Sequence, residues 1–399
     1  MVAAPQMTIP YTPIDLESPR GSEISREITT PSDKMVQPQA MPMFKRRVAT
    51  LILIAGLGLA GSGQSRADTG WTVTAKPVFS GQYAAVGDPS VIRANGRYLM
   101  FHHCLDVERD PQGGEVCLVQ STDGQSWSHA KTANASRLVK GRLLRARIGG
   151  WDEAHETPFA RQQGDTIWLY VLGYQGSGFF INPASSGIGL VKSRNPLAFP
   201  DMPPPVLLPS VAADQGGITS PSVVQTPSGA VLSYTGWSCS LAEPDCQQGK
   251  TRLQLSLIGV ALDRAGKPRG KPRVIVGDPG LAWTNGGTSE AEIITGPDGR
   301  FYLFFSSLSG PAGQPFARQR IGIAVAETAL GPYSFAPDPI LSPGDVAGTW
   351  ANGGVLAPSV LIENGRVRLW FTGFELDAAG GIGSARIGYA EHPWPIWSD

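Results

Sequence analysis

Five segments of the chain repeat one pattern of apolar and polar positions. Each begins with small or acidic residues, continues as a short apolar strand, reverses in a tight polar turn and returns as a strand rich in aromatic side chains. The copies span 87–103, 156–174, 220–238, 289–307 and 357–375. A sheet unit of this kind has an apolar face that it cannot bury alone, and radial packing of several copies solves the problem. The pattern therefore predicts an all-β fold, a five-bladed β-propeller.

A third apolar strand follows each hairpin after a variable loop. These strands lie in 114–127, 186–199, 251–263, 320–335 and 385–395. They place the blades near 85–130, 152–200, 216–270, 286–337 and 353–397 of a propeller that spans 68–399. The fifth copy has little chain left for a fourth strand, whereas 71–79 reads as a strand ahead of the first copy. We therefore expect 71–79 to complete the fifth blade and close the ring, which removes exposed sheet edges.

The N-terminal region has the three-part layout of a secretory signal peptide. Three basic residues, 45–47, precede an apolar run over 48–60, and Ser65-Arg66-Ala67 resembles a small-x-small cleavage site. We predict a signal peptide over 43–67 and a secreted or periplasmic protein; a membrane anchor is the alternative. Residues 1–42, which are polar and rich in proline, are predicted to be a non-native or disordered upstream extension.

The charge and the cysteine content indicate which partners and which compartment this protein has. The 33 basic and 33 acidic residues give a formal net charge of zero, which argues against a nucleic-acid partner. No stretch after residue 67 is apolar enough for a stable membrane span. Cysteines flank one loop of the first repeat and the corresponding loop of the third, which predicts two local disulfides in an oxidising compartment. The pairs are Cys104 with Cys117 and Cys239 with Cys246.

Aligning the repeats compares five equivalent positions at the start of the innermost strands. They hold Asp88, Thr157, Ser220, Glu290 and Ala357. Only Asp88 and Glu290 are carboxylates, and in a ring of five their blades face each other across the central channel. Hydrolysis of a glycosidic bond requires such a pair, because one carboxylate activates a water and the other delivers a proton to the leaving oxygen.

At these positions the chain resembles a known family. The five blades, the run 87–89 (Gly-Asp-Pro) and the run 289–291 (Ser-Glu-Ala) resemble the five-bladed glycosidases of glycoside hydrolase family 43. The resemblance implies that Asp88 is the general base and Glu290 the general acid of an inverting hydrolase. It also implies a substrate among oligo- or polysaccharides that contain pentoses or furanosides.

The chain departs from the family at one place. At the position of Ser220, the family has a third carboxylate. It is an aspartate that adjusts the pKa of the general acid and orients its side chain. The candidates to replace it are Glu156, Asp214 and Glu292. A carboxylate near Glu290 would raise the pKa of that acid by repulsion between like charges.

Loop residues near the channel mouth are candidates for substrate binding. Trp283 and Trp350 stand seven residues before Glu290 and Ala357, and Trp151 stands seven before Pro158. Their rings either stack on sugars or pack between blades. His155 is a candidate for binding water or a metal. A substrate hydroxyl or carboxylate could be bound by Arg320, and also by Arg109 and Arg318. Spacings typical of a metal site are missing, so we expect no cofactor; a structural cation in the channel stays open.

These observations predict a secreted glycoside hydrolase. Two alternatives stay open: a transglycosidase or phosphorylase on the same scaffold, and a propeller that binds glycans without catalysis. Dependence of turnover on phosphate would identify a phosphorylase. Sugar binding that survives Asp88→Asn without product release would identify a binding protein.

Overall fold

The computed structural model describes residues 70–397 except for several short segments, namely 82–84, 106–113, 137–138, 148, 176–184, 241–242, 248–249, 309–317 and 377–381. The predicted signal peptide and the extension before it lie outside the described residues, as does Arg109. In the described part, α-helix is limited to α1 (Pro244–Gln247), and short 3₁₀ turns span Ala212–Asp214 and Pro343–Asp345. No helix of this part is long and apolar enough to cross a lipid bilayer.

The strands form five consecutive antiparallel meanders. The first has β2 (Ala85–Ala94), β3 (Arg97–Leu105) and β4 (Glu115–Ser121), with β5 (Ser128–His129) and β6 (Arg142–Leu144) on β4. The second has β7 (Ala154–Gln163), β8 (Thr166–Tyr174) and β9 (Gly187–Ser193). The third has β10 (Gly217–Thr226), β11 (Gly229–Trp237), β12 (Leu255–Leu262) and β13 (Pro268–Val276). The fourth has β14 (Thr288–Thr295), β15 (Phe301–Ser307), β16 (Arg320–Ala326) and β17 (Ser334–Phe335), and the fifth has β18 (Gly354–Glu363), β19 (Arg366–Leu376) and β20 (Ile382–Pro393).

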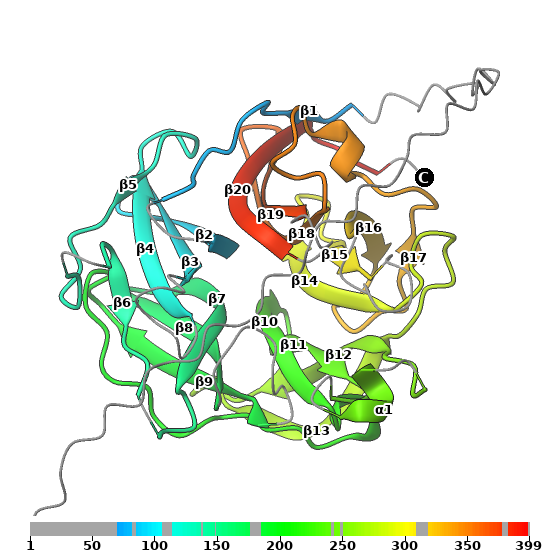
Figure 1. Ribbon diagram of the computed structural model, residues 1–399, viewed down its shortest axis with the longest axis horizontal. Helices are drawn as coiled ribbons and strands as arrows, with labels where there is room; N and C mark the ends of the chain where they lie inside the picture. The colour runs from blue at the N-terminus through cyan, green and yellow to red at the C-terminus, as the bar shows by residue number, and fades with distance from the viewer. Residues whose placement is uncertain are drawn as a thin grey trace, which may run out of the picture. The chain divides into compact units, whose positions relative to one another are not determined.

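The first strands of the five meanders meet in a closed cycle. β2 contacts β7, β7 contacts β10, β10 contacts β14, β14 contacts β18, and β18 returns to β2. Figure 1 shows these strands around a common centre, with the later strands of each meander farther out. The prediction of an all-β fold is confirmed. The cycle is also the arrangement that the five sequence repeats predict.

The segment ahead of the first repeat joins the last meander, as predicted. β1 (Thr72–Val73) pairs with β20 through Thr72–Glu391 and Val73–Ala390. Phe79 forms a further antiparallel bridge with Ile387. A single parallel pairing, Ala85 with Ala385, links β2 to β20. Strands from the two ends of the described region therefore share one sheet.

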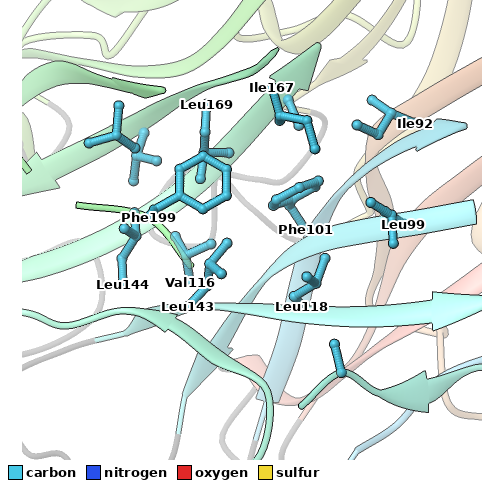
Figure 2. Close-up of a cluster of buried hydrophobic side chains, with 14 of the residues drawn as sticks. Ile92, Leu99, Phe101, Val116, Leu118, Leu143, Leu144, Ile167, Leu169 and Phe199 are labelled. Atoms are coloured by element: carbon cyan, nitrogen blue, oxygen red, sulfur yellow. The ribbon is translucent and has the colours of Figure 1, made fainter. Parts of the chain in front are cut away.

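Apolar side chains pack between neighbouring meanders. Figure 2 shows Phe101 and Leu118 of the first meander facing Leu169 of the second, and all three are fully buried. Phe199 packs edge-on against Phe101, with 6.3 Å between ring centroids. Truncating a buried leucine of this kind costs about 2–5 kcal/mol, so these clusters hold the strand positions firmly.

Both predicted disulfides are present. Cys104 on β3 is bonded to Cys117 on β4, and Cys239 after β11 is bonded to Cys246 in α1. Each bridge closes a short loop within one meander. Their presence agrees with an oxidising compartment.

Candidate active site

Each first strand carries a β-bulge at the equivalent position of its repeat. The pairing register shifts there in all five meanders, so that two residues oppose one on the neighbouring strand. The first residue of each bulge has φ between 40° and 51°, a left-handed conformation that non-glycine residues rarely adopt. Backbone of this kind is typical of functional sites. We call these residues the bulge ring: Asp88, Thr157, Ser220, Glu290 and Ala357.

Side chains of the preceding meander hold the bulge amides. The N–H of Asp88 donates to the Thr372 hydroxyl at 2.8 Å, and that of Glu290 donates to the Thr235 hydroxyl at 2.9 Å. The N–H of Ala357 donates to the Ser306 hydroxyl at 2.9 Å. Ser220 N–H donates to the Thr157 hydroxyl at 3.1 Å, and Thr157 N–H to the Asp88 carboxylate. Each strained turn is therefore stabilised by the neighbouring sheet.

The bulge ring lines one central pocket. The rest of the lining consists of the residues that follow each bulge position, with Phe159 and Glu292 beside them. The cavity is narrow, about 40 Å³. That volume holds a few water molecules, since one water needs roughly 10–15 Å³. The cavity is therefore too small to enclose a ligand much larger than water.

Asp88 lies in an environment that keeps its pKa close to neutral. Its side chain is 13% exposed, and His103 Nδ1 lies 3.9 Å from Oδ2. Burial raises the pKa of Asp88 to about 7, while the hydrogen bond from Thr157 N–H opposes the rise. Burial lowers the pKa of His103 to about 3, so this imidazole is neutral at pH 7. Asp88 is thus the carboxylate of the site with the highest tendency to ionise.

Glu290 has the higher pKa of the two predicted catalytic carboxylates. Burial and repulsion by Asp88 raise its pKa to about 8, whereas hydrogen bonds from Ser306, Ala357 and Gln319 oppose the rise. Gln319 is 1% exposed, and its Nε2 lies 3.5 Å from Glu290 Oε2. At pH 7 this carboxyl group is mainly protonated and able to act as an acid.

Glu156 belongs to the same electrostatic cluster. It is 1% exposed, and the Tyr174 hydroxyl donates to its Oε1 at 2.5 Å. Burial raises its pKa to about 8, and repulsion by Asp88 and Glu290 adds to the rise. Three of the predicted carboxylates, on the first, second and fourth meanders, therefore lie close enough to affect one another.

The other two candidate carboxylates have structural roles. Asp214 accepts N–H groups of Ser210 and Val211 at 2.7 and 2.8 Å, and Tyr234 donates to it at 2.9 Å. It therefore caps a 3₁₀ turn away from the central pocket, and its assignment as the third carboxylate is wrong. Glu292 lines the pocket, but its Oε2 accepts Val360 N–H at 2.8 Å.

The interpretation of the three tryptophans as sugar platforms is wrong. None lines the central pocket. Trp283 is 6% exposed, stacks on Phe305 with 5.5 Å between ring centroids, and donates its indole N–H to Pro337 O at 3.1 Å. Trp350 stacks on Phe371 at 6.0 Å.

Glycines explain why the indole rings of these tryptophans lie on the sheets. A Cβ at Gly173 would meet Trp151 at 2.5 Å, and one at Gly373 would meet Trp350 at 2.4 Å. The missing side chains open a flat surface on each sheet, and the indole covers it. The alternative of structural packing is therefore the correct one.

His155 and Arg320 lie outside the central pocket. His155 is fully buried, with Nε2 3.3 Å from Asp152 Oδ2, and Arg147 holds the same aspartate at 2.8 Å. Arg320 lines a second pocket beside the fourth and fifth meanders. Over the described ranges, no group of three or more His, Cys, Asp or Glu side chains is arranged to hold a metal.

Sequence reasoning missed three residues that contact the carboxylates: His103, Tyr174 and Gln319. The repeat alignment contains a signal for the first, because His103 occupies the place of the hydroxyls of Thr235, Ser306 and Thr372. Tyr174 and Gln319 stand at strand ends, where no periodic pattern indicates a partner.

No protein-family profile matches the sequence, and no characterised protein matches it by sequence. Solved structures do share its fold. A thermostable family-43 glycoside hydrolase superposes with a TM-score of 0.54 at 17% identity, covering 79% of this chain and 91% of its own. Another glycoside hydrolase gives 0.57 at 13% identity, covering 80% and 89%. An endo-arabinase from Bacteroides thetaiotaomicron gives 0.51 at 15% identity, covering 82% and 98%.

Proposed function

We propose that this protein is a five-bladed β-propeller glycoside hydrolase that inverts the anomeric centre. The observation that carries the proposal is a cluster of three carboxylates with raised pKa values: Asp88 and Glu290 line one central pocket, and Glu156 interacts electrostatically with both. The shared fold with family-43 glycoside hydrolases supports it.

The two catalytic roles are those that the family resemblance implies, with Asp88 as the base and Glu290 as the acid. Burial raises the pKa of both groups, and repulsion between them favours a state in which the pair holds one proton. Asp88 removes a proton from a water in the narrow cavity, and the water oxygen bonds to the anomeric carbon. The glycosidic C–O bond breaks, and Glu290 transfers its proton to the leaving oxygen. Proton exchange with solvent then restores both groups.

Glu156 acts as the positioning carboxylate that the blade-three aspartate supplies in the family. Ser220 cannot ionise, whereas Glu156 is held by Tyr174 and repels both Asp88 and Glu290. Its negative charge above pH 8 favours the protonated form of Glu290, which is the form that donates. The third carboxylate is therefore supplied by a different meander.

The substrate class follows from the fold alone. We propose oligo- or polysaccharides with pentose or furanoside units, since the endo-arabinase has this fold. A secreted or periplasmic location is consistent with the two disulfides.

The first test compares the catalytic pair with a surface carboxylate. Asp88→Asn and Glu290→Gln should each lower kcat on arabinan, xylan or aryl pentosides by about 10³-fold or more. Asp165→Asn, which removes an exposed carboxylate paired with Arg194, should leave kcat unchanged. Melting curves check folding, and proton NMR of the first product identifies inversion.

Three results would contradict the proposal. Turnover that persists in both variants would remove Asp88 and Glu290 from the mechanism. Glycan binding by the native protein without any product would identify a binding propeller, and turnover that requires phosphate would identify a phosphorylase.

A further inference from the structure

A second pocket lies beside the segment that carries Gln319. Gln319 stands between two arginines in sequence, Arg318 and Arg320, and its amide Nε2 lies 3.5 Å from Glu290 Oε2. Both arginines line the second pocket, which has a volume of about 470 Å³. Figure 1 shows β16, which begins at Arg320, in the meander adjacent to β18.

The two guanidinium groups are available for a ligand. Arg320 Nε is buried and has no hydrogen-bond partner among the residues that the structure describes. Neither Arg318 nor Arg320 forms an ion pair with a described carboxylate. Arg318 is exposed, and its left-handed backbone (φ 63°) is held by its N–H, which donates to Gly353 O at 2.5 Å.

The rest of the lining matches a sugar better than a simple anion. Asp338 lines the same pocket and can accept hydroxyl groups. Asn352 also lines it; its Oδ1 accepts Leu376 N–H, which leaves the amide N–H groups as donors. Two arginines and one aspartate give a local charge of +1, which suits a ligand with a single negative charge. Guanidinium groups bind planar carboxylates through paired hydrogen bonds.

We propose that this second pocket is a subsite for an acidic sugar, a uronic acid, on the leaving-group side of the bond that is cleaved. The assignment to that side rests on the proposed function, because an acid protonates the leaving oxygen, and Gln319, whose amide lies 3.5 Å from Glu290, stands in sequence between the two arginines. Arg318 and Arg320 bind the carboxylate, and Asp338 and Asn352 bind ring hydroxyls. The preferred substrate is then a neutral sugar linked to a uronate.

Binding measurements test the subsite separately from catalysis. The probes are digalacturonate and its methyl ester, in which each carboxylate is replaced by an uncharged ester group, titrated calorimetrically at 0.15 M salt into the native protein and into Glu290→Gln. We expect digalacturonate to bind about 10-fold or more tightly than the ester in both proteins, as charge-assisted hydrogen bonds allow. Arg320→Gln and Arg318→Gln should reduce this preference to about 2-fold or less, while Arg273→Gln, an exposed arginine on β13, should leave it intact.

The variants separate the possible outcomes. Arg320→Lys keeps the charge without the planar fork and should lose most of the preference, while melting curves check folding. Equal binding of the ester and the acid, or a preference unchanged in both glutamine variants, would overturn the subsite. Inorganic sulfate that displaces digalacturonate at equal concentration would reduce it to a general anion site and also overturn it. A uronate preference that depends on both arginines, in a protein without turnover, supports the subsite and rejects the hydrolase.

Discussion

The first strands of the five meanders carry two rings of equivalent residues, two positions apart. The bulge ring has left-handed backbone, and its amides are held by the preceding meander. The second ring has extended backbone and consists of Ser90, Phe159, Ser222, Glu292 and Ser359. Both rings lie on the same five strands around the central channel. Comparing their side-chain contacts therefore shows what the local backbone conformation changes.

Side chains of the second ring are occupied by the following meander. Ser359 accepts Val91 N–H at 2.9 Å, Ser90 accepts Ala160 N–H at 2.9 Å, and Glu292 accepts Val360 N–H at 2.8 Å. In the bulge ring the backbone amides make the corresponding contacts, and the side chains of Asp88 and Glu290 face the pocket. One ring therefore supplies chemistry and the other holds neighbouring sheets together, although a glutamate occurs in each.

The largest effect is expected for Glu156, which stands next to Thr157 of the bulge ring. Glu156→Gln should lower kcat by about 10-fold or more, because the residue positions the acid and base electrostatically. Removing a charge that repels Glu290 should also move the alkaline limb of the pH–kcat profile to lower pH. Glu156→Asp should restore part of the activity. An unchanged profile and kcat would exclude Glu156 from the site.

The second prediction compares one serine from each ring. Ser359→Ala leaves Val91 N–H buried without an acceptor, which should reduce the free energy of unfolding by about 1–3 kcal/mol. The Ser220 hydroxyl contacts only the Thr219 hydroxyl, at 3.3 Å, among its described contacts. Ser220→Ala should therefore change stability by about 0.5 kcal/mol or less. Urea unfolding of both variants decides the matter, and equal losses would remove the distinction between the rings.

The smallest expected effect concerns the charge of Glu292. Burial raises its pKa to about 8, against about 4.3 in the unfolded chain. The folded state thus binds the extra proton between these values, so native stability falls as pH rises from about 4 to about 8. Glu292→Gln cannot lose a proton, and its advantage should grow over that window to about 1 kcal/mol or more. Melting temperatures at pH 4 and pH 8 test this; a constant difference would contradict it.

The sequence predicted the parts of the site that depend on equivalence between repeats. Asp88 and Glu290 were found because their places are set by local alignment, and 71–79 because it lacked a partner strand. The left-handed backbone of the bulge ring has no such signal, since glycine is absent from all five positions. Non-glycine residues hold that conformation here with their amides bound by side chains of the preceding meander, a hydroxyl in four cases and the Asp88 carboxylate for Thr157.

Contacts between meanders could not be predicted, because they depend on packing. The electrostatic interaction with Asp88 and Glu290 distinguishes Glu156 from Asp214, and strand order alone does not show it. The tryptophans recur at the right spacing for a binding loop, yet glycines such as Gly173 direct them onto the sheets. Periodicity identified which residues are equivalent but not which side of the sheet they occupy.

The hydrogen bond between Asp88 N–H and Thr372 has a consequence for biosynthesis. Asp88, the proposed base, is among the first residues of the propeller to be translated. Thr372, whose hydroxyl accepts the Asp88 N–H, is among the last. No nascent chain that stops short of the fifth meander can hold Asp88 in its final geometry. Placement of the proposed base thus requires the fifth meander, and a truncated product that ends before Thr372 lacks this hydrogen bond.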